Sequence, residues 1–178
     1  DHDFFKPQNK EKKYDVVFTG NMGYPPNVDA SEFLVNNIMP TVWKKHPNTK
    51  LLIAGASPAR KVLSLRSSKV VISGWMDDIR DAYAESKIFI APMRIGTGLQ
   101  NKLLEAMSMK IPTITTSLAN DALTAKNRQE ILIGDSANEL AENIIELMED
   151  STLNEKIAEA GYKFVQKKII VGKKQLRN

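Results

Sequence analysis

From residue 14 onwards, short apolar runs alternate with longer stretches of helical character. The runs are apolar at consecutive positions, as parallel strands buried on both faces require. They lie at residues 16–19, 51–54, 70–73, 88–91, 113–116 and 131–133. Strands that alternate with helices predict βαβ units. We therefore expect an α/β fold, a Rossmann-like three-layer α/β/α domain with a six-stranded parallel sheet.

The stretches between these runs predict six helices. They are expected at residues 29–45, 59–65, 78–84, 99–109, 138–148 and 153–167. Asp29, with Glu32 three residues later, resembles a capping pair at the start of the first helix. Asp77 and Asp78 do not form an Asp-x-Asp metal motif, and we interpret them as the cap of the third helix.

The two ends of the chain differ in composition from its middle. Residues 1–13 are polar and rich in Lys, begin without an initiator Met, and resemble a linker that follows another part of a longer protein. Residues 169–178 are basic and weakly patterned, which indicates either a solvated tail or a helix that packs against an absent partner. We expect the folded domain at residues 14–168.

Composition narrows the classes of function. Of the 178 residues, 42% are hydrophobic, which is enough for one core. The net charge of +4 suits an anionic small ligand or membrane surface and is too small to favour nucleic acid as a partner. The chain has no Cys and two His, so disulfides and thiolate sites are excluded and zinc is not favoured. No run approaches the roughly 18 apolar residues that span a bilayer, so we expect a cytoplasmic protein.

Glycine follows four of the predicted strands. Gly20, Gly55 and Gly74 come directly after the first three, and Gly96 and Gly98 follow the fourth. In an open parallel sheet the carboxyl ends of the strands form the ligand crevice, and glycine lets the backbone approach a ligand there. A single glycine of this kind is common in any turn. The four together favour a binding edge.

The loop and helix start at residues 92–105 carry the strongest local signal. Backbone N–H groups at the start of a helix have no intrahelical partner and carry partial positive charge, so this junction is suited to an anion such as phosphate. Arg94 before the loop and Lys102 in the first helical turn can each add a charged contact to phosphate.

Two familiar phosphate fingerprints do not fit. A P-loop needs Gly-x-x-x-x-Gly-Lys-Ser/Thr, whereas here Gly96 is followed five positions later by Asn101, and Lys102 is followed by Leu103. A dinucleotide fingerprint needs Gly-x-Gly-x-x-Gly after the first strand, whereas the chain has Gly20-Asn-Met-Gly23. A dehydrogenase is therefore disfavoured.

The helix after the loop is amphipathic. At about 100° per residue, Asn101, Lys102 and Glu105 fall on its polar side. A carboxylate one turn below the helix start can accept hydrogen bonds from a ribose diol while the helix end holds phosphates. The same spacing also suits an ordinary solvated pair of charges.

Five segments together resemble the C-terminal domain of family-four retaining glycosyltransferases of the GT-B fold. They are residues 3–7 (DFFKP), 18–27 (FTGNMGYPPN), 74–78 (GWMDD), 105–114 (EAMSMKIPTI) and 139–162. The resemblance covers essentially the whole chain. The loop is similar to a branch that reads Arg-Ile-Gly-x-Gly and is associated with exopolysaccharide synthesis.

The resemblance implies a nucleotide-sugar site. Its diphosphate would lie on the amides of residues 99–101, and Glu105 would be the second glutamate of the family's Glu-x7-Glu pair, which binds the ribose. Thr97 stands where the first glutamate would be. The base would lie near Trp75 and Met76. The full expected binding set is Gly20, Asn21, Gly23, Gly55, Trp75, Met76, Gly96, Thr97, Gly98, Leu99, Gln100, Asn101, Lys102 and Glu105.

The resemblance also implies an activity. The chain would be the donor-binding domain of a glycosyltransferase of hexosyltransferase type, moving a sugar with retention to a saccharide or lipid-linked acceptor. Arg94, Lys102 and Glu105 would serve catalysis, without cofactor or metal. The partner would be an acceptor-binding N-terminal domain of the same polypeptide, without which this domain would be inactive, and a lipid-linked acceptor would bring it to the inner face of the membrane.

Two other readings remain open. A sugar-nucleotide epimerase shares the architecture and a diphosphate site, but it needs carboxylates around the donor sugar, and Thr97 does not provide one. A receiver-type binding module needs an acidic cluster after the first strand, and residues 20–23 have none.

Overall fold

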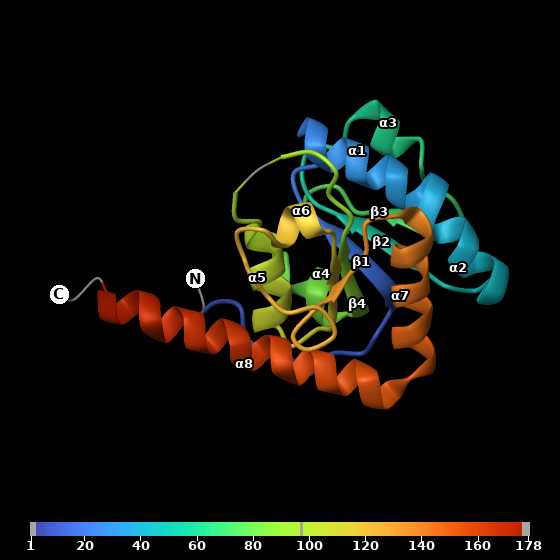
Figure 1. The fold of residues 1–178 in the computed structure, drawn as a ribbon. Helices are drawn as coiled ribbons and strands as arrows, with labels where there is room; N and C mark the ends of the chain where they lie inside the picture. Colours follow the sequence, from blue (N-terminus) through green and yellow to red (C-terminus); the bar gives the residue numbers. More distant parts are fainter. Residues whose placement is uncertain (1–2, 97, 176–178) are drawn as a thin grey trace.

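The computed structural model describes residues 3–96 and 98–175, with the side chains of the last helix described up to residue 171. Its sheet has six strands in the order β3-β2-β1-β4-β5-β6, and all neighbours are parallel (Figure 1). The strands are β1 (Tyr14–Thr19), β2 (Leu51–Ala54), β3 (Val70–Ile72), β4 (Ser86–Ala91), β5 (Thr113–Thr115) and β6 (Leu132–Ile133). The predicted six-stranded parallel α/β fold is confirmed.

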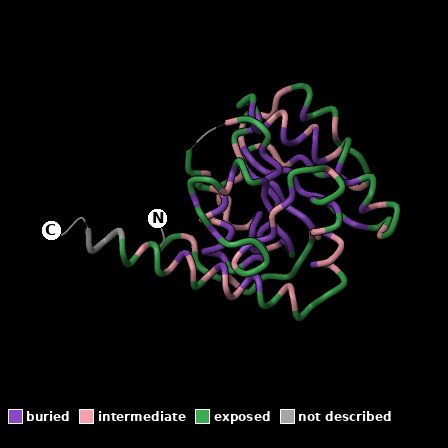
Figure 2. Tube along the Cα trace, in the orientation of Figure 1, coloured by how far each residue is buried: buried purple, intermediate pink, exposed green. Residues whose placement is uncertain are grey.

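Helices cover both faces of the sheet. They are α1 (Pro25–Phe33), the π-helical turn η1 (Leu34–Ile38), α2 (Met39–Lys45), α3 (Arg60–Leu63), α4 (Arg80–Ala84), α5 (Asn101–Ser108), α6 (Ser117–Asn120), α7 (Ala137–Glu149) and α8 (Ser151–Gln175). On one face α2 and η1 pack against α7, and on the other α5 packs against α8. The sheet between these layers forms the buried core (Figure 2).

The first helix begins earlier than predicted, so the interpretation of Asp29 as its cap was wrong. Tyr24 is the N-cap and Pro25 the first helical residue, because proline fixes φ near its helical value and has no N–H to leave unpaired. The carboxylate of Asp29 instead binds Arg94, with 2.7 Å between Oδ1 and Nη2.

The ends of β1 and β2 meet closely. Gly55 has a φ of +141°, and a Cβ on it would lie 1.7 Å from the carbonyl oxygen of Gly20. The backbones of the two strand ends therefore approach each other at a distance that only glycine allows. This contact forms part of the floor of the cavity described below.

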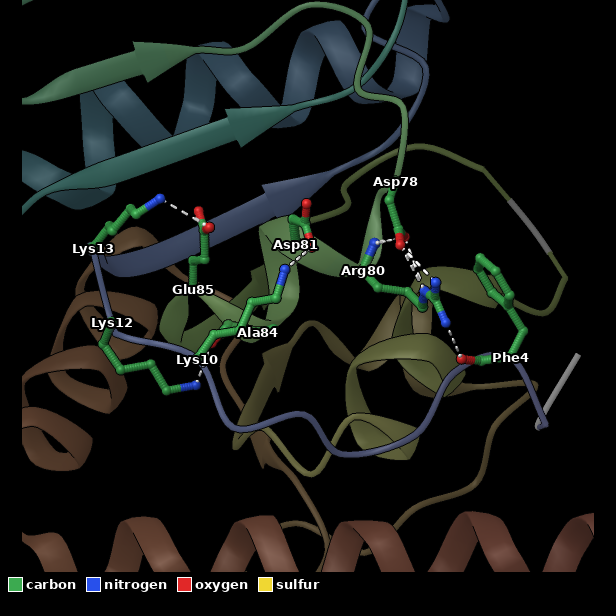
Figure 3. Close-up of polar contacts among 9 residues, drawn as sticks. All are labelled: Phe4, Lys10, Lys12, Lys13, Asp78, Arg80, Asp81, Ala84 and Glu85. Carbon is green, nitrogen blue, oxygen red and sulfur yellow. Dashed lines mark hydrogen bonds and ion pairs between the residues drawn. The ribbon is translucent and has the colours of Figure 1, made fainter.

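The N-terminal segment, residues 3–13, lies along α4. Lys10 binds Asp81, Lys12 Nζ donates to the Ala84 carbonyl at 2.7 Å, and Lys13 Nζ binds Glu85 Oε1 at 2.9 Å (Figure 3). We call this segment the N-terminal strap. The role of this segment as an interdomain linker remains a prediction. Its lysines bind it to the rest of the domain.

The last helix is longer than predicted. It was expected to end at residue 167, whereas α8 runs without interruption to Gln175 and projects past the body of the domain (Figure 1). The change to a basic composition at residue 169 therefore falls inside a continuous helix. Ile170 and Val171 on this projecting part are more than half exposed.

Candidate functional site

A cavity of about 520 Å³ opens at the carboxyl ends of the central strands. It lies beside β1, where the strand order turns from β2 on one side to β4 on the other, the position at which open α/β sheets bind ligands. Its lining residues are Phe4, Thr19, Gly20, Asn21, Asn27, Gly55, Ala56, Trp75, Met76, Asp77, Asp78, Ile79, Asn101, Lys102 and Glu105.

More than half of the predicted binding residues lie on this cavity. They are Gly20, Asn21, Gly55, Trp75, Met76, Asn101, Lys102 and Glu105. Gly23, Gly96, Gly98 and Gln100 are not among the lining residues, in the part of the chain that the structure describes. Thr97 lies outside the described residues.

Lys102 reaches the cavity from the first turn of α5. Its Nζ donates to Asn27 Oδ1 of α1 at 2.5 Å and lies 5.0 Å from the centre of the Phe18 ring. Burial lowers the pKa of Lys102 to about 8, while the charge of Glu105 acts in the opposite direction. The ammonium group is thus held in place by a neutral amide, which leaves its charge available to an anion.

Glu105 lies one turn further along α5. Its Oε2 accepts a hydrogen bond from the Tyr83 hydroxyl at 2.6 Å, and the same hydroxyl lies 2.8 Å from Thr19 Oγ1. Tyr83 is completely buried, and this burial, followed by the nearby charge of Glu105, raises the pKa of its phenol well above the usual value. Lys102 and Glu105 are each bound to another element of the fold, so the interpretation of them as a solvated pair does not fit.

The start of α5 faces the same cavity. The helix begins at Asn101, two residues later than predicted, with Gln100 as its N-cap. The Gln100 side chain makes no capping bond among the described residues, although the Leu103 N–H donates to the Gln100 carbonyl at 3.0 Å. The N–H groups of Asn101 and Lys102 are the ones in the first turn that are open to an anion. Asn101 and Lys102 both line the cavity at this point.

Arg94 is not among the lining residues of this cavity, in the part of the chain that the structure describes. Its guanidinium is bound by Asp29 of α1 and lies 4.2 Å from the centre of the Phe33 ring. The hydrogen bond that Arg94 donates to the Asp29 carboxylate raises the pKa of Arg94. Its role as a second phosphate-binding cation therefore remains a prediction that its position does not favour.

Two lining residues of the cavity, Asp78 and Phe4, are joined by Arg80. Asp78 Oδ1 accepts the backbone N–H of Arg80 at 2.9 Å, so it satisfies one donor at the start of α4, although the N-cap position itself is Ile79. The Arg80 guanidinium binds the Asp78 carboxylate, donates to the Phe4 carbonyl at 3.3 Å and lies 3.9 Å from the Phe4 ring centre (Figure 3). This contact joins the N-terminal strap to the cavity.

Sequence reasoning gave no binding role to Tyr83 or to seven lining residues of the cavity, which are Phe4, Thr19, Asn27, Ala56, Asp77, Asp78 and Ile79. Asn27 and Thr19 belong to the segment that resembles the family, but no local pattern assigned them a role. Tyr83 gave no signal, because its partners Thr19 and Glu105 are 64 and 22 residues away in the sequence.

A second, more apolar cavity of about 510 Å³ lies between α5 and α8. It includes Phe5, Leu104, Val165 and Ile169, and also Leu99, which was predicted for the nucleotide site. The two cavities share Asn101 and Glu105, so α5 forms the boundary between them.

Within residues 3–96 and 98–175, no three His, Asp or Glu side chains gather as a metal-binding group. No helix there has both the length and the apolar character needed to cross a membrane.

The fold and the cavity define a Rossmann-like domain with a cavity at the switch point of its sheet. The family model described as glycosyl transferases group 1 matches residues 13–150, and the chain belongs to this family. An uncharacterized 44.6 kDa protein in the cps region of Klebsiella pneumoniae is 26% identical over 160 residues, which are 85% of this chain and 41% of that protein. This chain therefore spans less than half the length of that relative.

Solved structures show the same fold. The C-terminal domain of the glycosyl transferase group 1 family protein LpcC from Francisella tularensis has a TM-score of 0.74 at 20% identity, over 95% of this chain and 97% of that one. HepE from Anabaena, in complex with UDP and glucose, has a TM-score of 0.71 at 14% identity, over 86% of this chain and 44% of that one. The fold is thus that of the C-terminal domain of GT-B glycosyltransferases.

Proposed function

We propose that this chain is the donor-binding domain of a glycosyltransferase that moves a sugar from a nucleoside diphosphate to a saccharide or lipid-linked acceptor, with retention of configuration. The observation that carries the proposal is that the start of α5, Lys102 and Glu105 all face one cavity at the sheet's ligand edge. Membership of glycosyl transferases group 1 supports sugar transfer as the reaction class.

The chemistry of this edge suits a departing nucleoside diphosphate. When the sugar leaves, negative charge grows on the terminal phosphate, and positive charge fixed in advance stabilises it. The start of α5 supplies partial charge from its N–H groups and Lys102 supplies an ammonium ion. We therefore propose that neither a metal nor a cofactor is required.

The other end of the cavity suits the nucleoside. Glu105 would accept hydrogen bonds from the ribose hydroxyls, and the backbone near Trp75 and Met76 would contact the base. The Trp75 side chain is 74% exposed, so its ring is not part of a preformed base pocket. Polysaccharide synthesis is supported by the cps-region relative.

Transfer would need the rest of a longer protein. The chain spans 41% of the length of its Klebsiella relative, and we propose that an acceptor-binding N-terminal domain completes the enzyme. This domain alone would then bind donor and transfer nothing. A lipid-linked acceptor would bring the cytoplasmic enzyme to the inner face of the membrane.

Calorimetric titration of the chain with UDP, GDP and ADP, in buffer with and without a chelator, tests the proposal. We expect one of the three to bind, with the same affinity in both buffers. A receiver-type module would bind none of them, and that result would refute the proposal. Loss of binding in chelator would refute the metal-free site alone.

A further inference from the structure

Tyr83 is a buried side chain whose polar end meets the candidate site. It is the largest of the fully buried side chains, and its ring packs at 5.6 Å from the Phe89 ring and at 6.1 Å from the Phe5 ring of the N-terminal strap. Phenylalanine would provide the same packing. A buried hydroxyl costs free energy unless it is hydrogen-bonded, so the bonds that Tyr83 makes account for its identity better than its packing does.

The hydrogen bonds of this hydroxyl have a direction. A carboxylate has no proton to donate, so Tyr83 donates its one proton to Glu105 Oε2. The hydroxyl of Thr19, 2.8 Å away, must then be the donor in the contact that it makes with Tyr83. Thr19, Tyr83 and Glu105 thus form a chain of donors that ends on the carboxylate, and such chains strengthen their members.

This arrangement occupies one of the two carboxylate oxygens of Glu105. Among the described residues, the hydrogen bond to the Glu105 side chain falls on Oε2. Oε1 is left to accept a bond from a ligand in the cavity that Glu105 lines. A glutamate without such a partner would sample several rotamers, and ordering it would cost part of the binding free energy.

Tyr83 itself is held from both sides. It lies in α4, and Lys10, Lys12 and Lys13 of the N-terminal strap bind residues 81, 84 and 85 in this helix and directly after it (Figure 3). Its ring lies between Phe5 and Phe89. The carboxylate therefore adjusts to the phenol, rather than the phenol to the carboxylate.

We propose that Tyr83 is a positioning residue for the donor: its hydroxyl holds Glu105 in the orientation that receives the ribose diol. The inference rests on the proposed function, because it needs a nucleotide in this cavity. Tyr83 acts through Glu105 and does not contact the ligand itself.

The test is the preference of the protein for a ribose that carries its hydroxyls. Calorimetry measures the association constants of the nucleoside diphosphate that binds best and of its 2′,3′-dideoxy form. The ratio of the first constant to the second reports the contacts of the ribose hydroxyls. In Tyr83→Phe we expect this ratio to fall about fivefold, because the Glu105 side chain would then have to be ordered when the ribose binds. The affinity for the dideoxy form should not change.

Three further variants sharpen the result. In a Glu105→Ala background, adding Tyr83→Phe should leave the ratio unchanged, because the acceptor that Tyr83 positions is gone. Thr19→Val, which removes the donor to the phenol oxygen, should lower the ratio by a smaller factor. Tyr14→Phe makes the same change at the amino end of β1 and should leave the ratio as it is in the unaltered chain.

The outcomes separate the two proposals. If the unaltered chain binds none of the three diphosphates, the proposed function fails and this role fails with it. If it binds one of them and Tyr83→Phe keeps the ratio, only the role of Tyr83 fails. An equal loss of affinity for both forms would mean a general structural effect and would also overturn the role, as would a fall in the ratio in Tyr14→Phe.

Discussion

Two regions flank the start of α5, and they are built differently. On one side, Lys102 and Glu105 are held by Asn27 and Tyr83, which belong to other elements of the fold. On the other, the loop before α5 has Ile95 and Leu99 about half exposed. We call the first region, together with Gly20 and Gly55 on the same cavity, the held wall. We call the second region, residues 92–96 and 98–100, the loop. The held wall has its polar groups in place before a ligand arrives, so donor affinity should depend on it far more than on the loop.

The largest effect is expected at the floor of the held wall. In Gly55→Ala the new Cβ would lie 1.7 Å from the Gly20 carbonyl oxygen, on a residue with a φ of +141°. Both strand ends would have to move, and we expect a loss of about 3 kcal/mol or more in the free energy of unfolding. Denaturant unfolding measures it. A loss below about 1 kcal/mol would show that the two strand ends are not rigid.

The next largest effect is expected when a positively charged side chain is removed from the held wall, compared with the same change in the loop. Lys102→Met and Arg94→Met each remove a positive charge and keep a side chain of similar length. We expect Lys102→Met to weaken nucleoside diphosphate binding about tenfold, because a charged hydrogen bond to phosphate is lost. Arg94→Met should change it less than about twofold, since Asp29 already binds that guanidinium at the surface. Calorimetry measures the affinity of both variants. Equal losses of affinity would contradict the distinction between the held wall and the loop.

A pH series examines the held wall without mutation. The pKa of Lys102 is lowered to about 8 by burial, with Glu105 the charged neighbour that opposes the shift. Below that pH the ammonium is charged and available to phosphate. Above it the free protein loses the proton, so binding must restore it, and affinity should fall about fivefold between pH 7 and pH 9. The same titration of Lys102→Met should be flat, and a parallel slope there would assign the pH dependence to another group.

The same lowered pKa has a consequence for folding of the free chain. The unfolded chain holds this proton more tightly than the folded one, with a usual lysine pKa of 10.5. Between pH 8 and that value, the contribution of Lys102 to the free energy of unfolding therefore rises with pH, in the opposite direction to its contribution to binding.

The smallest effect is expected in the loop. Gly98 has a φ of +84°, but among the described residues other than its chain neighbours no atom lies within 4 Å of the place where a Cβ would stand. Gly98→Ala should therefore cost about 1 kcal/mol of backbone strain and no steric clash. Unfolding and nucleotide binding are measured together, and a loss as large as that of Gly55→Ala would show that the loop is as constrained as the held wall.

Much of the fold could be predicted because its signals are local. The strands are runs of consecutive apolar residues, and the central ones are buried as a parallel sheet requires. Helix limits were less certain, since Asp29 and Glu32 resemble a cap although Pro25 already starts the helix. Prolines in a first turn are as strong a start signal as an acidic pair.

The site was predictable only in part, for a different reason. Lys102 and Glu105 follow from the periodicity of one helix. Their partners Asn27 and Tyr83 come from elements 75 and 22 residues away, and contacts across such separations leave no pattern in a single sequence. Arg94 was placed by its proximity to the loop in sequence, whereas Asp29, 65 residues away, determines where it lies.

The N-terminal strap bears on where a recombinant fragment of this domain should begin. A fragment that begins at Tyr14 would keep every strand and helix, yet it would lack the lysines that neutralise Asp81 and Glu85 and the aromatic ring that lies against Tyr83. The start point of the expressed gene should therefore precede Phe4, even though residues 3–13 form no strand or helix of their own.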